Sequence, residues 1–133
     1  MESIVINPST LVRPRGYNHA IKTTGCAAIL FLGGQVAWDR EGQLVGEHDI
    51  VLQFDKALEN ILTVVREAGG NAQSIVKLNL YVTDKEAYLA AQKELGQAYL
   101  RHMGKHFPAM TLVEVKSLYE AGAQVEIEGL AVL

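Results

Sequence analysis

The chain has 133 residues, of which 49% are hydrophobic and 20% charged, and its net charge is −3. This length fits one domain and the composition argues against disorder, so we expect residues 1–133 to form a single domain. The negative charge and the lack of any run of Lys or Arg argue against nucleic acid as a partner.

The N-terminus lacks the pattern of a signal peptide, and no apolar run is long enough to span a membrane. The single cysteine, Cys26, cannot form an intrachain disulfide, which fits a reducing compartment. These features predict a cytoplasmic protein without a membrane partner.

The N-terminal half contains three short strand patterns followed by one long helix pattern. Strands are predicted at residues 3–6, 20–24 and 27–33, with Gly25 as the bend between the second and the third. The third is almost entirely apolar, which indicates burial on both faces. Residues 49–68 are predicted to be helical, because their apolar residues recur at spacings of three and four and form one stripe.

The second half begins with an alternating pattern at residues 75–82, which predicts a half-buried strand. Thr83 and Glu86 have the spacing of a helix capping box. We therefore predict one helix over residues 83–103, ended by Gly104.

The last predicted strands, residues 111–115 and 123–133, complete an α+β domain in which one mixed β-sheet carries two helices on one face. The odd-numbered residues of the final strand are expected to point toward the helices. Its other face carries carboxylates at the start and Leu130 and Val132 at the end. Because such apolar side chains need a cover, we expect the protein to self-associate.

Four short motifs follow one another along the chain. They are Gly-Tyr-Asn-His-Ala at 16–20, Gly-Gln-Val at 34–36, Phe-Pro-Ala-Met at 107–110 and Val-Glu-Ile-Glu at 125–128. Their order and spacing resemble the Rid/YjgF family, whose best-understood members hydrolyse reactive 2-imino and 2-enamino acids. The resemblance implies a chorismate-mutase-like fold, a homotrimer, and a cleft between subunits that takes a small molecule without a cofactor or a metal.

The same resemblance assigns a role to several side chains. Glu126 corresponds to the glutamate that orients the hydrolytic water. Gly33 stands where the family has a cleft serine, and Gln92 aligns approximately with a family asparagine. The residues that it places in the substrate cleft are Tyr17, Gly33, Gly34, Gln35, Gln92 and Met110.

Met110 is the main departure from the family, since the family holds the substrate carboxylate with an arginine at this position. Guanidinium forms two parallel charged hydrogen bonds to a carboxylate, whereas the methionine thioether is apolar and weakly accepting. The site has therefore either turned to a less anionic ligand or gained another cation. Arg15 and then Arg13 are nearest to Tyr17 in sequence; the alternative reading of both is a solvated surface loop.

Three functions stay open at this stage. The first is hydrolysis of an imine or enamine to a carbonyl compound and ammonia, with altered substrate preference. The second is a small-molecule-binding trimer without catalysis that regulates a pathway. The third is an endoribonuclease or translation inhibitor, against which the acidic charge argues. We expect Tyr17, Met110 and Glu126 to converge on one cleft shared between subunits.

Overall fold

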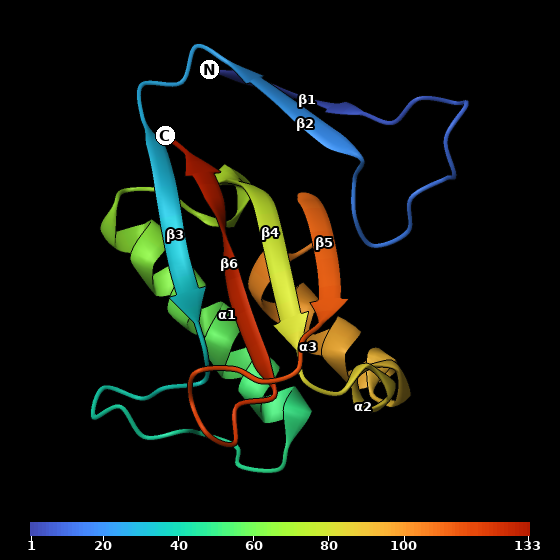
Figure 1. The fold of residues 1–133 in the computed structure, drawn as a ribbon. Helices are drawn as coiled ribbons and strands as arrows, with labels where there is room; N and C mark the ends of the chain where they lie inside the picture. The colour runs from blue at the N-terminus through green and yellow to red at the C-terminus, as the bar shows by residue number, and fades with distance from the viewer.

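The computed structural model describes all 133 residues as a four-stranded sheet with helices on one face and a separate two-stranded hairpin (Figure 1). The strands of the main sheet are β3 (Ile29–Gln35), β6 (Val125–Val132), β4 (Ile75–Val82) and β5 (Ala109–Glu114), in the order β3-β6-β4-β5. β4 and β5 run parallel, and the other neighbours are antiparallel. The predicted α+β class with a mixed sheet is confirmed.

Helix α1 (Ile50–Glu67) lies across the sheet and supplies much of the core. It begins after Asp49, whose carboxylate accepts hydrogen bonds of 3.1 Å from the N–H groups of Val51 and Leu52. The predicted helix is therefore correct to within one residue at each end. No helix of the protein combines the length and the apolarity that crossing a membrane requires.

The second predicted helix is broken into α2 (Lys85–Ala90) and α3 (Gln92–Met103), so the prediction of one continuous helix was wrong. The capping residue is Asp84 rather than Thr83, because its carboxylate accepts the N–H of Ala87 at 3.0 Å. At the break, the N–H of Ala91 is shared between two carbonyls. The break separates α2, which has no buried residue, from α3, which packs on the core. Elsewhere in the chain, a 3₁₀ turn, η1 (Ala72–Ser74), precedes β4.

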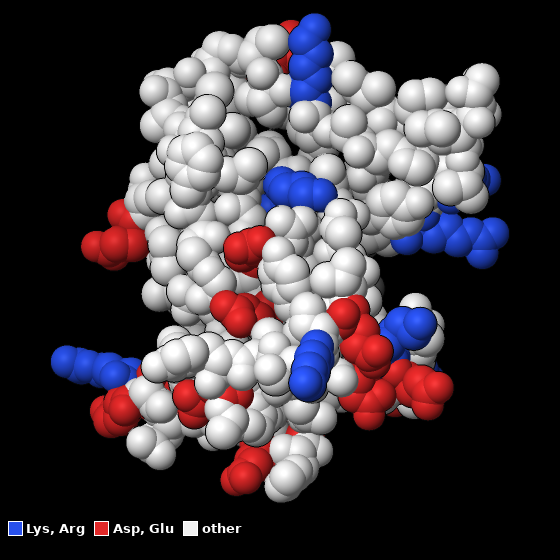
Figure 2. All heavy atoms as spheres, in the orientation of Figure 1, with Lys and Arg blue, Asp and Glu red and all other residues white.

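The faces of β6 follow the predicted alternation. Val125, Ile127 and Ala131 are fully buried toward the helices. The opposite, open face carries acidic side chains over β6 (Figure 2). The predicted exposure of Val132 on this face was wrong, since it is 7% exposed. The most exposed apolar side chains of this face are Ile29 and Phe31 on the edge strand β3.

The expectation of a single sheet was also wrong, because β1 (Glu2–Ile6) and β2 (Ala20–Thr24) pair only with each other. The chain after Gly25 does not fold β2 back onto β3. The N–H groups of Ala27 and Ala28 both donate to the carbonyl of Leu133, at 2.7 and 3.0 Å. Because Ala27 and Ala28 bond to the C-terminus, β3 begins at Ile29 rather than at the predicted residue 27.

Gln53 is the one fully buried polar side chain of α1, and it ties two loops to that helix. Its amide N–H group donates to the carbonyls of Gly46 and Gly122 and to Gln124, at 3.1–3.2 Å. Its carbonyl oxygen accepts the N–H of Gln124 at 2.7 Å. One side chain thus ties the loops around Gly46 and Gly122 to α1.

We expect Gln53→Leu to lower the free energy of unfolding by roughly 2–4 kcal/mol, because buried carbonyls and an N–H lose their partner. Urea denaturation measures this change. Gln97→Leu, at an exposed position on α3, is the matched control and should stay within about 0.5 kcal/mol of the wild type. Equal effects of the two substitutions would show that the network does not contribute.

Candidate functional site

A pocket of about 350 Å³ lies between the sheet and the helices α2 and α3. Its lining is largely apolar and aromatic: Phe54, Leu80, Tyr88, Leu95, Tyr99, Phe107 and Met110. The polar side chains that reach it are those of Arg15 and Gln92. This composition, an apolar body with few polar groups, is typical of a small-molecule site.

Met110 is directed into this pocket by the pairing of β5. In the parallel register Met110 lies beside Leu78, and Leu112 lies beside Leu80. Leu78 and Leu80 are buried against the helices, so the alternation of β5 places Met110 on the same side. Met110 is half-buried and packs against the core, which gives the pocket an apolar floor.

The loop before β2 is anchored at the mouth of the pocket by Asn18. Its backbone N–H donates to the carbonyl of Pro108 at 3.1 Å, and its side-chain amide donates to the carbonyl of Phe107. Tyr17 and Arg15 therefore line a second hollow that Met110 also borders. Arg13 lines a different hollow and does not reach Met110. Of the two arginines that were candidates to replace the missing cation, Arg15 is therefore the one that shares a hollow with Met110.

Neither arginine forms an ion pair, and Arg15 is exposed. Tyr17 is half-buried and its ring packs edge-on against that of His19, with centroids 5.5 Å apart. The structure thus brings Tyr17, Arg15, Gln92 and Met110 to one region.

The other predicted site residues lie elsewhere, at the far end of β3. A Cβ at Gly34 would overlap the Glu126 carboxylate, so only glycine lets that side chain lie against β3. Gln35 pairs with Ile127 after an irregularity in the ladder. Gly33 borders a shallow hollow on the open face.

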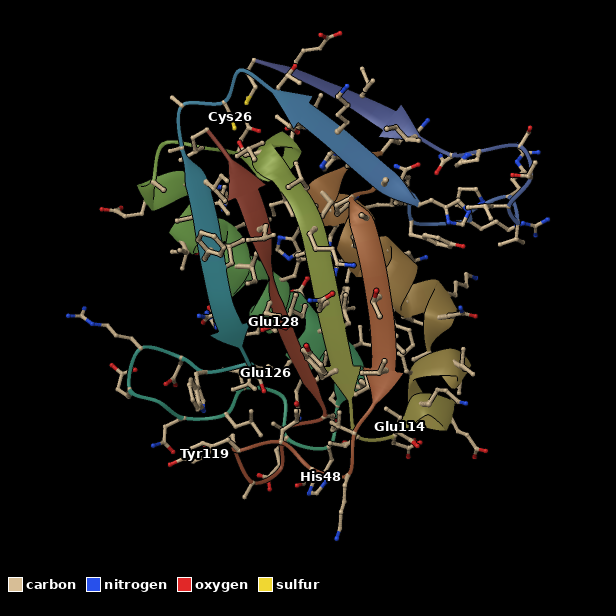
Figure 3. The ribbon with its side chains drawn as sticks, turned by 45° about the horizontal axis from the view of Figure 1, so that its top comes forward. Cys26, His48, Glu114, Tyr119, Glu126 and Glu128 are labelled. Carbon is tan, nitrogen blue, oxygen red and sulfur yellow. The ribbon has the colours of Figure 1, made fainter.

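Met110 and Glu126 lie on opposite faces of the sheet. Glu126 pairs with Tyr81, whereas Met110 pairs with Leu78, and the alternation of β4 sends Tyr81 and Leu78 to opposite sides. Figure 3 shows Glu126 and Glu128 together on β6. A single chain therefore keeps two candidate half-sites apart, one around Met110 and one around Glu126.

Sequence reasoning missed a polar cluster beside Glu126. The hydroxyl of Tyr81 donates to Glu128 Oε1 at 2.5 Å, and the amide of Asn79 donates to the same oxygen at 3.3 Å. The hydrogen bond to Glu128 is the main cause of a raised pKa of Tyr81. Because β4 and β6 are adjacent, the alternation of Asn79 and Tyr81 was the signal that could have revealed it. The Glu126 carboxylate itself makes no hydrogen bond or ion pair, although its backbone is part of the β4–β6 ladder.

Two tyrosines line the pocket walls, and burial raises the pKa of both Tyr88 and Tyr99. The Tyr99 hydroxyl donates to the carbonyl of His106 at 2.5 Å, and its ring stacks on Phe107 with centroids 5.4 Å apart. The walls of the pocket therefore stay uncharged at neutral pH.

The fold and the pocket define a small α+β protein with an apolar site between its sheet and its helices. A family model described as "Endoribonuclease L-PSP" matches residues 10–133. The chain belongs to this family, the Rid/YjgF family that its motifs resemble.

Individual relatives agree with this assignment. The chain is 31% identical to the mitochondrial protein mmf2 of Schizosaccharomyces pombe, with 98% of each chain covered. The crystal structure of the Rid-family protein YyfB from Yersinia pestis has a TM-score of 0.87 and 34% identity, with both chains fully covered. YyfA of the same organism has a TM-score of 0.67 and 32% identity, over 99% of this chain and 100% of its own.

The raised pKa of Tyr99 predicts how the free energy of unfolding changes at alkaline pH. Burial raises the pKa of folded Tyr99 above the unfolded value of about 10. The neutral phenol therefore contributes fully to the free energy of unfolding below pH 10, and this contribution is lost as the pH rises further. Tyr99→Phe should cost about 1 kcal/mol at pH 7 through the lost hydrogen bond. The free energy of unfolding of Tyr99→Phe should also fall less steeply above pH 10 than that of the wild type.

Urea unfolding between pH 7 and pH 11 measures both effects. Tyr119→Phe is the control, since Tyr119 is 97% exposed and should change neither quantity. An unchanged slope above pH 10 in Tyr99→Phe would contradict the assignment.

Proposed function

We propose that the protein hydrolyses imines or enamines that carry an apolar or aromatic substituent, in a cleft formed between subunits of a homotrimer. The observation that carries this proposal is the pocket above Met110, with Arg15 at its mouth. The location would be cytoplasmic, and no nucleic acid or membrane would take part.

The pocket supports an apolar or aromatic ligand body. Its floor is Met110 and its walls include Tyr88, Tyr99 and Phe107, so a small dianionic substrate would lose its hydration without a charged partner. A carboxylate attached to an aromatic body is better accommodated, because its charged end would remain at the mouth near Arg15. Solvent screens that exposed guanidinium, so it is a weaker anchor than a buried arginine.

Glu126 of a neighbouring subunit is the proposed water-activating residue. Its carboxylate would take a proton from water as the oxygen adds to the C=N carbon. The proton then goes to nitrogen, and collapse of the resulting carbinolamine releases ammonia and leaves a carbonyl compound. The support is that Glu126 lies against Gly34 and makes no hydrogen bond or ion pair within its own chain.

The trimer is proposed because the two half-sites lie on opposite faces of one sheet, and only a second chain can bring them together. The exposed Ile29 and Phe31 on the sheet edge also call for a cover. We expect light scattering at micromolar concentration to give roughly three times the chain mass of 14.5 kDa. A stable monomer would remove the shared cleft.

Ammonia release from imines generated by an amino-acid oxidase tests the chemistry. Against a relative that carries the arginine, we expect at least about 100-fold slower hydrolysis of small imino acids, since a bidentate charged pair is missing. Met110→Arg should recover about tenfold or more of this deficit, and Arg15→Ala should raise KM for an aromatic imino acid. Small imino acids turned over at the relative's rate would refute the role of Met110.

Glu126→Gln should lower kcat by roughly 10²–10⁴-fold, the usual weight of a general base. Glu114→Gln is the matched control at the end of β5, which β4 separates from β6, and Gln can still accept the Lys85 N–H that Glu114 binds. Wild-type protein that binds an aromatic 2-oxo acid in calorimetry but releases no ammonia would favour the alternative, a non-catalytic small-molecule-binding trimer.

Endoribonuclease action or inhibition of translation is the least supported alternative, although "Endoribonuclease" is part of the family description. The chain carries 15 acidic and 12 basic residues without a basic run, and basic side chains are scattered over the face in Figure 2. Phosphate backbones require clustered positive charge.

A further inference from the structure

The hairpin of β1 and β2 lies outside the main sheet and exposes much of its apolar surface. Every residue of β1 is exposed, and Ile4, Val5 and Ile6 are 46%, 54% and 40% accessible. These side chains alternate between the two faces of the hairpin, so both faces carry apolar surface. A two-stranded hairpin is marginally stable in water. This one therefore needs a cover.

The edge strand β3 also lacks a partner that would cover its apolar side chains. It pairs with β6 on one side, and its other edge has no partner. Ile29 and Phe31 on this strand are 57% and 77% exposed. A free strand edge with exposed apolar side chains is a template for a further strand.

The chain does not use β2 to fill its own β3 edge. Residues 25–28 are a short link that would suit antiparallel pairing of β2 with β3. That link is instead bonded to Leu133 through Ala27 and Ala28, and Gly25 turns the chain at a φ of 69°. At the other end Asn18 is held on Pro108. The hairpin consequently lies beyond the ends at which β4 and β5 begin (Figure 1).

We propose that the hairpin is an exchanged arm, in which β2 of one copy adds antiparallel to the free edge of β3 in a neighbouring copy. The pairing is the one that the short link would produce within a single chain, and strand exchange reproduces such contacts between copies at low cost. Because the exchange is head-to-tail, successive copies can close into a ring, as a trimer requires.

The exchange has a consequence for the cleft. In antiparallel pairing, the Ala20 end of β2 lies beside the Gly33–Gln35 end of the neighbouring strand. Tyr17 is three residues before Ala20, so the pocket mouth of one copy approaches Gly34 and Glu126 of the next. The arm would thus join the two half-sites. The inference concerns assembly and its test needs no turnover, so its failure is distinguishable from failure of the proposed hydrolysis.

Crosslinking between differently tagged, co-expressed chains tests the arm. All chains carry Cys26→Ser, which removes the only native cysteine. One chain carries Lys22→Cys on β2 and the other Phe31→Cys on β3, both at exposed positions. A short bis-maleimide should produce the heterodimer of the two tagged chains as the main crosslinked product. A chain with both substitutions should give covalent oligomers.

Lys93→Cys, exposed on the remote helix α3, replaces Lys22→Cys in the control and should give no heterodimer with Phe31→Cys. An internally crosslinked monomer from the double variant, without heterodimer from the mixture, would mean that β2 covers its own β3. Absence of both products would place the hairpin away from any β3 edge. Either result overturns the exchanged arm.

Discussion

The central position of β6 is the constraint on which the rest of the molecule depends. It pairs with β3 on one side and β4 on the other, so its alternation fixes both faces of the sheet. Val125 and Ile127 are fully buried under the helices, and this burial holds Glu126 and Glu128 on the open face. A one-residue shift in register would bury carboxylates in the core, which is why the strand cannot slip.

The same alternation separates the apolar pocket from the carboxylate that we propose as the water-activating group. β5 directs Met110 toward the helices, where α3 and the broken segment α2 form the pocket walls. β6 directs Glu126 the other way, onto the open face of the sheet. The two halves are placed by different strands, so a change in one leaves the packing around the other intact. Residue 110 can therefore be substituted without displacing the Glu126 carboxylate from its place against Gly34.

The elements that periodicity controls were predictable, and those set by long-range contacts were not. The stripe of α1 and the alternation of β4 and β6 need only local sequence. The separation of β2 from β3 depends on Leu133, more than a hundred residues away, which no local pattern encodes. For the site, the motifs predicted one cleft shared by Tyr17, Met110 and Glu126; within one chain Tyr17 lies near Met110, whereas Glu126 lies on the other face of the sheet. The aromatic walls and the bond between Tyr81 and Glu128 come from pairing across strands, which spacing along the chain does not show.

In the proposed function, a methionine at position 110, where the family resemblance implies an arginine, determines what the pocket selects. A guanidinium on this floor would lie among Tyr99, Phe107 and Leu80 and would need an anion to offset its burial. Met110 removes that requirement, and the tyrosine hydroxyls stay neutral because burial raises their pKa. Binding energy then has to come from apolar surface, at about 25 cal/mol per Å² buried, rather than from a charged pair. A ligand too small to cover the floor would gain little from such a site, so the proposed recognition rests on size and apolarity rather than on charge.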